Sequence, residues 1–295
     1  MVAPELIGAL DADMNQPPKI FNRQRYAMRR ARAAAQFSQH DFLHRRVFDD
    51  IVDRLESVKR DFPKAVFSGA SALTELITSA CGVGEVVSMD LSPKRLPPTS
   101  CRIASDEEAL PFARESLDLF VSVLTLHTVN DIVGALTQAR LALKPDGLFI
   151  AAAFGEETLS ILRNALYRAE AEITGGVSPR VAPFASIQDF GQALGRAGFA
   201  LPVVDIDKVS VRYANPMKLL RDLRGMGETN ALAKNTSPLR RDVLMQALNI
   251  FMENGGEERF DIVYATGWTP HESQQKPLRP GAGRMPLEVA VKKSN

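Results

Sequence analysis

The stretch FPKAVFSGASAL, residues 62–73, decides the fold of this chain. Its first half is a short apolar strand, and its second half is the turn at which an open α/β sheet binds its ligand. Glycines in such a turn let the backbone approach a nucleotide-like ligand, and the next helix points its N–H groups at that ligand. Gly69 is present, but Ser71 and Leu73 occupy places where two more glycines are expected, and Phe67 the place of an acidic residue. The pattern predicts a ligand-binding turn with a crowded approach.

Strands and helices alternate on both sides of this turn. An amphipathic helix over 43–55 precedes it, and a helix containing Leu73, Leu76 and Ile77 is expected to follow it. The alternation predicts an α/β protein with a doubly wound parallel sheet. A mostly helical stretch separates the last two strands, which indicates a hairpin at one sheet edge with the helices inserted as a cap over the ligand face. The segments of strand length and composition are 65–68, 85–89, 101–104, 117–126, 148–154, 201–211 and 260–268.

Composition limits the functions that fit the chain. Its 295 residues are 45% apolar and 24% charged with a net charge of +1, which argues against nucleic-acid binding driven by bulk charge. Cys81 and Cys101 give neither a disulfide framework nor a metal-ligand cluster, so we expect no metal and a reducing compartment. No apolar run approaches the ~20 residues of a membrane span, and residues 1–10 lack the basic start of a secretory signal. We expect a cytoplasmic protein, or one of the mitochondrial matrix if its source is eukaryotic.

A basic segment, NRQRYAMRRAR at residues 22–32, precedes the sheet. Its arginines lie on an expected helix, and a basic helix can rest on an anionic membrane surface or on an acidic partner. The alternative is a solvated lead-in helix whose Tyr26 and Met28 contact the body of the protein. The thin apolar face favours the second interpretation, with at most peripheral membrane contact.

Three polar residues follow expected strands, at the edge where an open α/β sheet binds its ligand. Asp90 ends the second strand, where a carboxylate either accepts hydrogen bonds from ribose hydroxyls or caps the following turn. Asp106 follows the third strand, where it either meets an adenine amino group or caps a short turn. His127 follows the fourth strand, as a catalytic base or as a structural histidine. The sequence leaves both alternatives open at each position.

Several motifs carry a resemblance to a known superfamily. IASDEEALPF (103–112), SLDL (116–119), LTLH (124–127) and LKPDGLFI (143–150) resemble class I S-adenosylmethionine-dependent methyltransferases, which include the malonyl-carrier-protein methyltransferases of biotin synthesis. A narrower resemblance comes from LRGMGETN (223–230) and GWTPHESQ (267–274), together with FNR (21–23) and GGVSP (175–179). These motifs are similar to those of the family of methyltransferase-like assembly factors of respiratory complex I and their bacterial relatives.

The resemblance implies a Rossmann-like sheet of seven strands whose last strand is antiparallel. Around it we divide the chain into an N-terminal helical extension (1–60), a cofactor-binding core (61–155), the remaining strands with a helical cap (156–273) and a tail (274–295). The implied cofactor is S-adenosylmethionine, and the side chains at the altered turn predict weakened binding. The residues implied to bind it are Gly69, Ser71, Asp90, Leu91, Asp106, Glu107, Leu124 and Leu126.

Methyl transfer needs few catalytic side chains, because the sulfonium already activates the methyl group and the protein mainly positions the acceptor and excludes water. The sequence therefore does not identify the acceptor. It is a small molecule or a protein such as a subunit of complex I, and we expect no nucleic acid. We expect loop 224–230 and segment 268–272 to meet over the cleft and form the acceptor site, with Trp268 and His271 as its walls. In this site Arg224 would clamp a carboxylate and Glu228 would receive a cationic side chain. The catalytic candidates are therefore His127, Arg224 and Glu228.

Three functions remain compatible with these features. The first is a methyltransferase, and the second is a complex I assembly protein that modifies a subunit. The mitochondrial relative implied by the resemblance is linked to arginine hydroxylation, so the fold need not mean methylation. The third is a non-catalytic binding protein with a degenerate turn. Asp90 and Asp106 favour the first two functions, and the altered turn favours the third.

Overall fold

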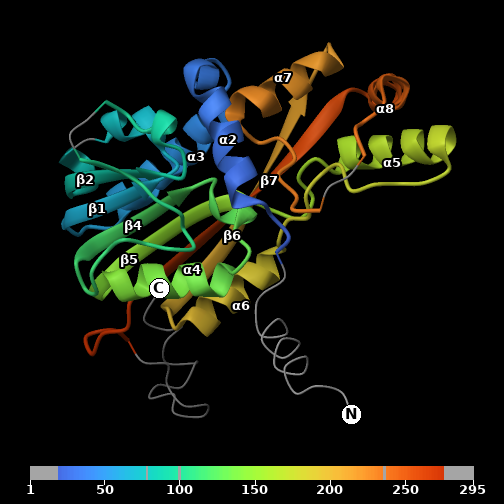
Figure 1. Cartoon of the computed structure of the whole chain (residues 1–295). Helices are drawn as coiled ribbons and strands as arrows, with labels where there is room; N and C mark the ends of the chain where they lie inside the picture. Colours follow the sequence, from blue (N-terminus) through green and yellow to red (C-terminus); the bar gives the residue numbers. More distant parts are fainter. Residues whose placement is uncertain (1–18, 78, 99–100, 235–236, 276–295) are drawn as a thin grey trace, which may run out of the picture.

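Seven strands form one sheet in the order β3-β2-β1-β4-β5-β7-β6, in a computed structural model that describes residues 19–77, 79–98, 101–234 and 237–275 (Figure 1). Each of the seven expected strands is present. Of the expected tail, residues 276–295 lie outside the described residues. The strands are β1 (Phe62–Ser68), β2 (Val83–Asp90), β3 (Arg102–Ala104), β4 (Leu117–Val123), β5 (Leu143–Phe154), β6 (Ala200–Arg212) and β7 (Glu257–Trp268).

The first five strands are parallel, and β7 is antiparallel to both β5 and β6. β1 lies between β2 and β4, so the winding of the chain reverses beside it, and the carboxyl ends of β1 and β4 flank a topological switch point. The expected hairpin of β6 and β7 forms one edge of the sheet. The fold predicted from the sequence is therefore confirmed.

Helices cover both faces of the sheet. α3 packs with α5, α7 and α8 in one apolar cluster, whereas α4 and α6 pack on the other face, α4 against β5 and α6 against β6 and β7 (Figure 1). Of the described helices, none is both long enough and apolar enough to cross a membrane. The helices are α2 (Arg23–Ala33), α3 (Phe42–Ser57), α4 (Ile132–Ala142), α5 (Ser160–Thr174), α6 (Ile187–Ala197), α7 (Pro216–Met226) and α8 (Arg241–Glu253).

The expected α-helix after β1 is a wrong prediction. Two short 3₁₀ turns, η2 (Ser71–Leu76) and η3 (Ser79–Cys81), occupy its place. Ser71 has a φ of 53°, a left-handed conformation that does not continue into a helix. Its hydroxyl donates to the Arg95 carbonyl at 2.7 Å, which ties the turn to the segment after β2. The turn therefore has no helix N-terminus of the kind that binds anionic ligand groups in related folds.

The basic segment forms helix α2, which begins at an Asn22 side chain that accepts from the Arg25 N–H at 2.9 Å. Tyr26 and Arg30 are buried, and Met28 is 53% exposed. The expected contact of Tyr26 with the body of the protein is present, Met28 is largely exposed, and the interpretation as a solvated helix is wrong for the buried Arg30. Residues one turn apart on a helix share a face, so Tyr26 and Arg30 are buried together.

Candidate functional site

Asp90, the last residue of β2, is fully buried at the switch point and is already paired. Its Oδ2 accepts from Arg30 Nη2 at 2.6 Å, and its Oδ1 accepts from Arg30 Nε at 3.2 Å and from the Ser92 N–H at 2.8 Å. Burial raises the pKa of Asp90, but the Arg30 guanidinium outweighs burial and holds this pKa below its ordinary value. Asp90 is therefore a carboxylate whose cation comes from helix α2.

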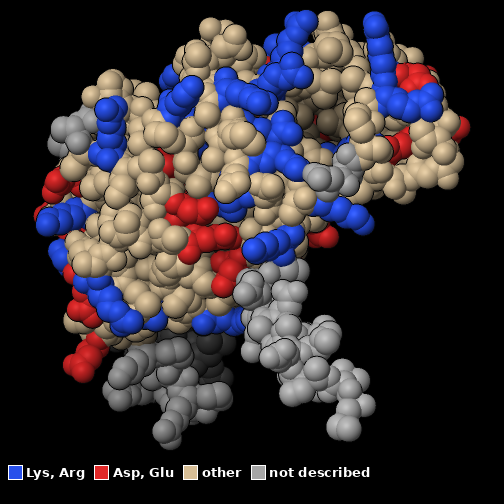
Figure 2. All heavy atoms as spheres, viewed as in Figure 1, with Lys and Arg blue, Asp and Glu red and all other residues tan. Residues whose placement is uncertain are grey.

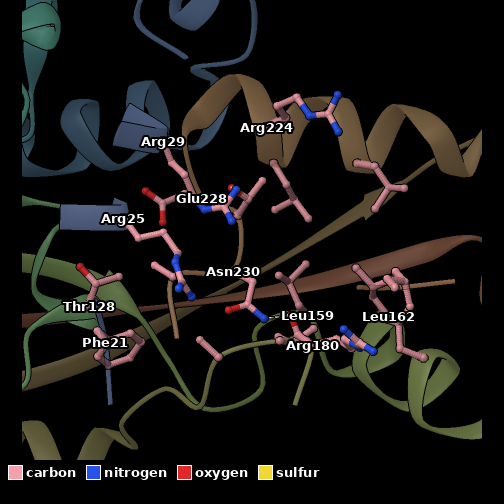
Figure 3. Close-up of a pocket in the computed structure, with 18 of the residues that line it drawn as sticks. Phe21, Arg25, Arg29, Thr128, Leu159, Leu162, Arg180, Arg224, Glu228 and Asn230 are labelled. Atoms are coloured by element: carbon pink, nitrogen blue, oxygen red, sulfur yellow. Dashed lines mark hydrogen bonds between the residues drawn. The ribbon is translucent and has the colours of Figure 1, made fainter. Parts of the chain in front are cut away.

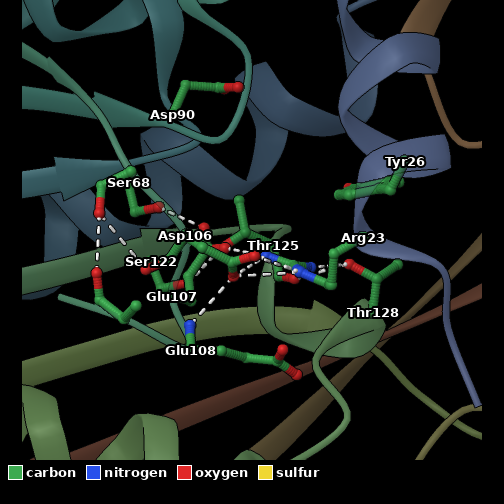
Figure 4. Close-up of polar contacts among 12 residues, drawn as sticks. Arg23, Tyr26, Ser68, Asp90, Asp106, Glu107, Glu108, Ser122, Thr125 and Thr128 are labelled. Carbon is green, nitrogen blue, oxygen red and sulfur yellow. Dashed lines mark hydrogen bonds and ion pairs between the residues drawn. The ribbon is translucent and has the colours of Figure 1, made fainter. Parts of the chain in front are cut away.

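A second arginine of α2, Arg23, forms ion pairs with the two carboxylates that follow β3 (Figure 4). Arg23 donates through Nη2 to Asp106 Oδ1 at 2.7 Å and also pairs with Glu107. Glu107 is buried and accepts from the Ser68 hydroxyl at 2.7 Å, which connects it to the end of β1. Arg23 also donates to the Thr128 hydroxyl at 2.7 Å. Arg23 thus joins the ends of β1, β3 and β4.

The turn after β1 is closed by the end of β4. Gly69 has a φ of 77°, and a Cβ built on it would lie 2.4 Å from both the Val123 carbonyl oxygen and Thr125 Cγ2. Leu124 also has a left-handed φ of 50°, which is strained for a residue with a side chain. The backbone of this turn therefore packs on protein, and glycine is required at position 69 for that reason.

These residues match a nucleoside-containing cofactor in kind and place. Asp90 and Asp106 lie at the strand ends where carboxylates meet a ribose and an adenine, but both are bound by arginines of α2. Both oxygens of Asp90 are buried and bound by Arg30, so Arg30 must move before Asp90 can accept from a ligand, whereas the Asp106 side chain is 25% exposed beside Arg23. Of the remaining candidates, Leu91 is half-buried, whereas Leu124 and Leu126 are buried in the two apolar clusters.

A buried hydrogen-bond network extends from Asp90 to His127. Arg30 Nη1 donates to the Tyr26 hydroxyl at 3.0 Å, and that hydroxyl donates to Glu228 Oε1 at 2.8 Å. The other oxygen, Glu228 Oε2, lies 2.9 Å from His127 Nε2. Burial raises the pKa of Glu228, but His127 and Arg30 outweigh burial, so this pKa lies below its ordinary value. Glu228 is thus a charged group with three protein partners.

A cavity of about 550 Å³ opens beside this network, between α2, α5, α7 and α8 (Figure 3). His127, Arg224 and Glu228, the three catalytic candidates from the sequence, all line it. Its volume is in the range of small-molecule sites. The structure therefore brings these three residues to one cavity.

The expected contact between loop 224–230 and segment 268–272 is absent. Trp268 pairs with Leu148 and Ala200, at the end of the sheet where β5 begins. Thr269 exchanges hydrogen bonds with Asp146 and Gly147 in the first half of β5, and Trp268 packs against Arg60. β7 runs opposite to β4, so its carboxyl end lies at the edge of the sheet away from His127. The prediction that Trp268 and His271 form walls of the acceptor site is therefore wrong.

Three residues of this site were missed by the sequence analysis: Arg23, Tyr26 and Arg30. The signal was present, because the arginines of the basic segment include two with a tyrosine between them on one helix face. Their carboxylate partners lie 60 to 202 positions along the chain, and local spacing does not identify such partners. No group of three or more histidine, cysteine or acidic side chains suited to a metal ion occurs among residues that the structure describes.

His44 of α3 is a buried histidine behind this site. Its burial should make the protein less stable at acidic pH. Both ring nitrogens lack a hydrogen-bond partner within the described residues, and the ring packs edge-on against Phe37 with centroids 4.8 Å apart. Burial, followed by the charges of Arg95 and Arg30, lowers the pKa of His44 well below its ordinary value. The folded protein therefore keeps His44 neutral, whereas the unfolded chain takes up a proton below pH ~6.5.

We expect the free energy of unfolding to fall with decreasing pH below ~6.5, by ~1.4 kcal/mol per pH unit for this one proton. His44→Phe should flatten that dependence, and the exposed His271→Asn should leave it unchanged. Urea titrations between about pH 5 and pH 8, the range in which histidine titrates, measure the slopes. Equal slopes in the wild-type protein and His44→Phe would contradict the assignment.

Comparisons with known proteins agree with this architecture. A family model described as a methyltransferase domain matches residues 66–151. The mitochondrial arginine-hydroxylase NDUFAF5 of Danio rerio is 38% identical over 262 residues, which are 84% of this chain and 81% of that protein. The malonyl-[acyl-carrier protein] O-methyltransferase of Laribacter hongkongensis is 30% identical over 275 residues, which are 85% of this chain and 90% of that protein.

A solved structure shows the same fold. The YcgJ protein of Bacillus subtilis superposes with a TM-score of 0.51 over 74% of this chain and 97% of its own, at 13% sequence identity. The resemblance found in the motifs is thus confirmed over most of the chain. This chain belongs to the class I methyltransferase superfamily and, within it, to the family of the NDUFAF5 proteins.

Proposed function

We propose that this protein is an assembly factor of respiratory complex I, built on the methyltransferase fold. The observation that carries the proposal is the 38% identity to NDUFAF5, which extends over 84% of the chain and so reaches well beyond the matched domain at 66–151. NDUFAF5 belongs to the complex I assembly factors that the sequence motifs resemble. Folds of this class serve many activities, so the assignment rests on this family match and on the site.

The fold and the matched domain support S-adenosylmethionine as the cofactor. When bound, this cofactor supplies a methyl group activated on a sulfonium. Asp90 would hold its ribose hydroxyls after Arg30 moves away, and the partly exposed Asp106 would hold its adenine amino group. The crowded turn at Gly69 supports weaker binding than a glycine-rich turn would allow.

We assign the acceptor side to the cavity beside His127. Arg224 lines the cavity from α7 and carries a charge that can hold an anionic group. Glu228 orients the His127 ring through the hydrogen bond at 2.9 Å, which makes Glu228 a positioning residue. Of the three, His127 would meet the acceptor at the floor of the cavity.

Arginine hydroxylation is the second candidate reaction. The relatives that share 36 to 41% of their residues with this chain carry the name arginine-hydroxylase, which favours it. Hydroxylation adds one oxygen atom to a side chain, and methylation adds one CH₂ unit. The mass of the modified subunit therefore distinguishes the two reactions.

Cells that lack the gene should lose most NADH:quinone oxidoreductase activity in their membranes, and the wild-type gene should restore it. Asp90→Asn should fail to restore activity, because its amide no longer offers two anionic oxygens to ribose hydroxyls and because Arg30 would be left a buried cation without its partner. The matched control is Asp53→Asn, an exposed position on α3, which should restore activity fully. Mass spectrometry of the purified complex then shows whether a subunit carries an added oxygen atom or CH₂ unit. Full activity in the deletion strain would refute the proposal.

A further inference from the structure

The cavity beside His127 combines an apolar wall with a cationic rim. The apolar wall comes from three helices, through Leu162 and Leu166 of α5, Leu223 of α7 and Leu244 of α8. Figure 2 shows Lys and Arg side chains around a hollow on this side of the molecule, between α7 and α5. Such a surface can bind an apolar chain and a charged group of the same ligand.

Arg29 is a partly buried cation at this rim with one donor that the described part of the chain leaves unsatisfied. Its Nη1 donates to the Thr229 hydroxyl at 2.7 Å, but its buried Nε has no hydrogen-bond partner among the residues described. Burial lowers the pKa of Arg29, and the charges of Arg25, Arg32 and Arg224 lower it further. A partly buried guanidinium surrounded by other cations is unfavourable unless an anion joins it.

The acid that lines the cavity does not supply this anion. Glu228 already accepts from Tyr26, contacts His127 at 2.9 Å and lies 3.5 Å from Arg30. Arg180 is held by Glu170 at 2.5 Å, so it is neutralised within the protein. The cationic excess is therefore local to the α2–α7 side of the cavity, where Arg29 and Arg224 lie.

We propose that this cavity binds an anionic amphiphile, with its carboxylate or phosphate on Arg29, Thr229 and Arg224 and its single apolar tail along the leucines of α5, α7 and α8. Charge-assisted hydrogen bonds would hold the anionic group, and Thr229 can donate its hydroxyl proton to it. This inference rests on the proposed function for its biological meaning, since the cavity is the one assigned to the acceptor. Its test is binding to the purified full chain, whereas the proposed function is tested in cells.

Calorimetric titration with matched ligands, kept below their micelle concentrations, tests the chemistry. Decanoate should bind at one site, decan-1-ol should bind at least about ten-fold more weakly because it lacks the charge, and acetate should not bind because it lacks the tail. Comparing decyl phosphate with inorganic phosphate shows whether a phosphate needs an apolar tail to bind. Tighter binding of decyl phosphate than of decanoate supports a phosphate headgroup, and the reverse supports a carboxylate.

Variants locate the site. Arg29→Gln and Arg224→Gln should each weaken decanoate binding by about ten-fold or more, as expected for loss of a hydrogen bond to a charged group. Leu244→Gln should weaken the tail contact, and Leu244 is only half-buried, so we expect this variant to fold. Arg221→Gln removes the same charge from the same helix α7. Arg221 lines a neighbouring cavity that shares Arg29, Thr229 and Arg224 with this one, but it does not line this cavity itself, so its effect should stay well below that of Arg29→Gln.

Several outcomes would overturn the proposal. Equal binding of decan-1-ol and decanoate would show that the anionic group is not recognised. An Arg221→Gln effect as large as that of Arg29→Gln would place the anion elsewhere. Binding to vesicles of phosphatidylglycerol without binding to decanoate or decyl phosphate would indicate a basic surface for membranes and no ligand cavity.

Discussion

Replacing Arg30 with methionine is expected to lower the free energy of unfolding by about 3–5 kcal/mol, because Asp90 would then be a buried charge without its partner. Arg30 and Asp90 are both fully buried, and their nearest charged atoms are 2.6 Å apart. Urea denaturation followed by circular dichroism measures the loss. Arg32→Met is the matched control, since Arg32 is exposed on the same helix, and its effect should stay within about 0.5 kcal/mol.

A double-mutant cycle isolates the pair. In an Asp90→Asn background, Arg30→Met should cost much less, because the buried negative charge is already gone. If Arg30→Met and Arg32→Met destabilise the protein equally, the pair does not hold α2 on the sheet. S-adenosylmethionine should raise the melting temperature of Arg30→Met more than that of the wild-type protein, since its ribose hydroxyls would find Asp90 free.

Gly69→Ala should destabilise the protein by at least about 3 kcal/mol, from the left-handed backbone together with the steric clash of the new Cβ. The Cβ would lie 2.4 Å from the Val123 carbonyl oxygen and from Thr125 Cγ2, so the end of β4 would have to move. Gly175 offers a matched control, because its φ of 70° is similar and no atom lies within 4 Å of a Cβ there. Gly175→Ala should therefore cost only about 1 kcal/mol.

The difference between the two glycine variants measures the packing of the turn apart from its backbone conformation. Thermal or urea unfolding of both variants supplies it. Equal losses would mean that the end of β4 relaxes without cost and that the turn is open enough for a ligand to approach. The prediction thus also tests whether the turn is as closed as the structure shows.

The centre of the sheet was predictable from the sequence because its strands are continuous apolar segments bounded by turn residues. Segment 117–126 illustrates this: residues 117–123 form β4, while Leu124, which is equally buried, leaves the strand through a left-handed conformation that no apolar pattern reveals. The helix expected after β1 failed for a similar reason. Leu73, Leu76 and Ile77 have helical spacing, but the left-handed Ser71 and its hydrogen bond to Arg95 favour 3₁₀ turns.

Of the site, only the residues that directly follow a strand were predictable from the sequence. Asp90 and Asp106 were found because carboxyl ends of parallel strands meet at one edge. Their pairing with Arg30 and Arg23 depends on how α2 packs across the switch point, which is a tertiary contact without a local signal. Trp268 was misplaced because an antiparallel strand carries its carboxyl end to the other edge of the sheet.

Arg30 belongs to two sites at once, since it pairs with Asp90 at 2.6 Å and lies 3.5 Å from Glu228. A ligand that takes Arg30 away from Asp90 also changes the charge that faces Glu228 and, through it, His127. Occupancy of the nucleoside side and of the cavity side is therefore thermodynamically linked through a single guanidinium. Such linkage is reciprocal: the factor by which the first ligand changes the affinity for the second equals the factor by which the second changes the affinity for the first.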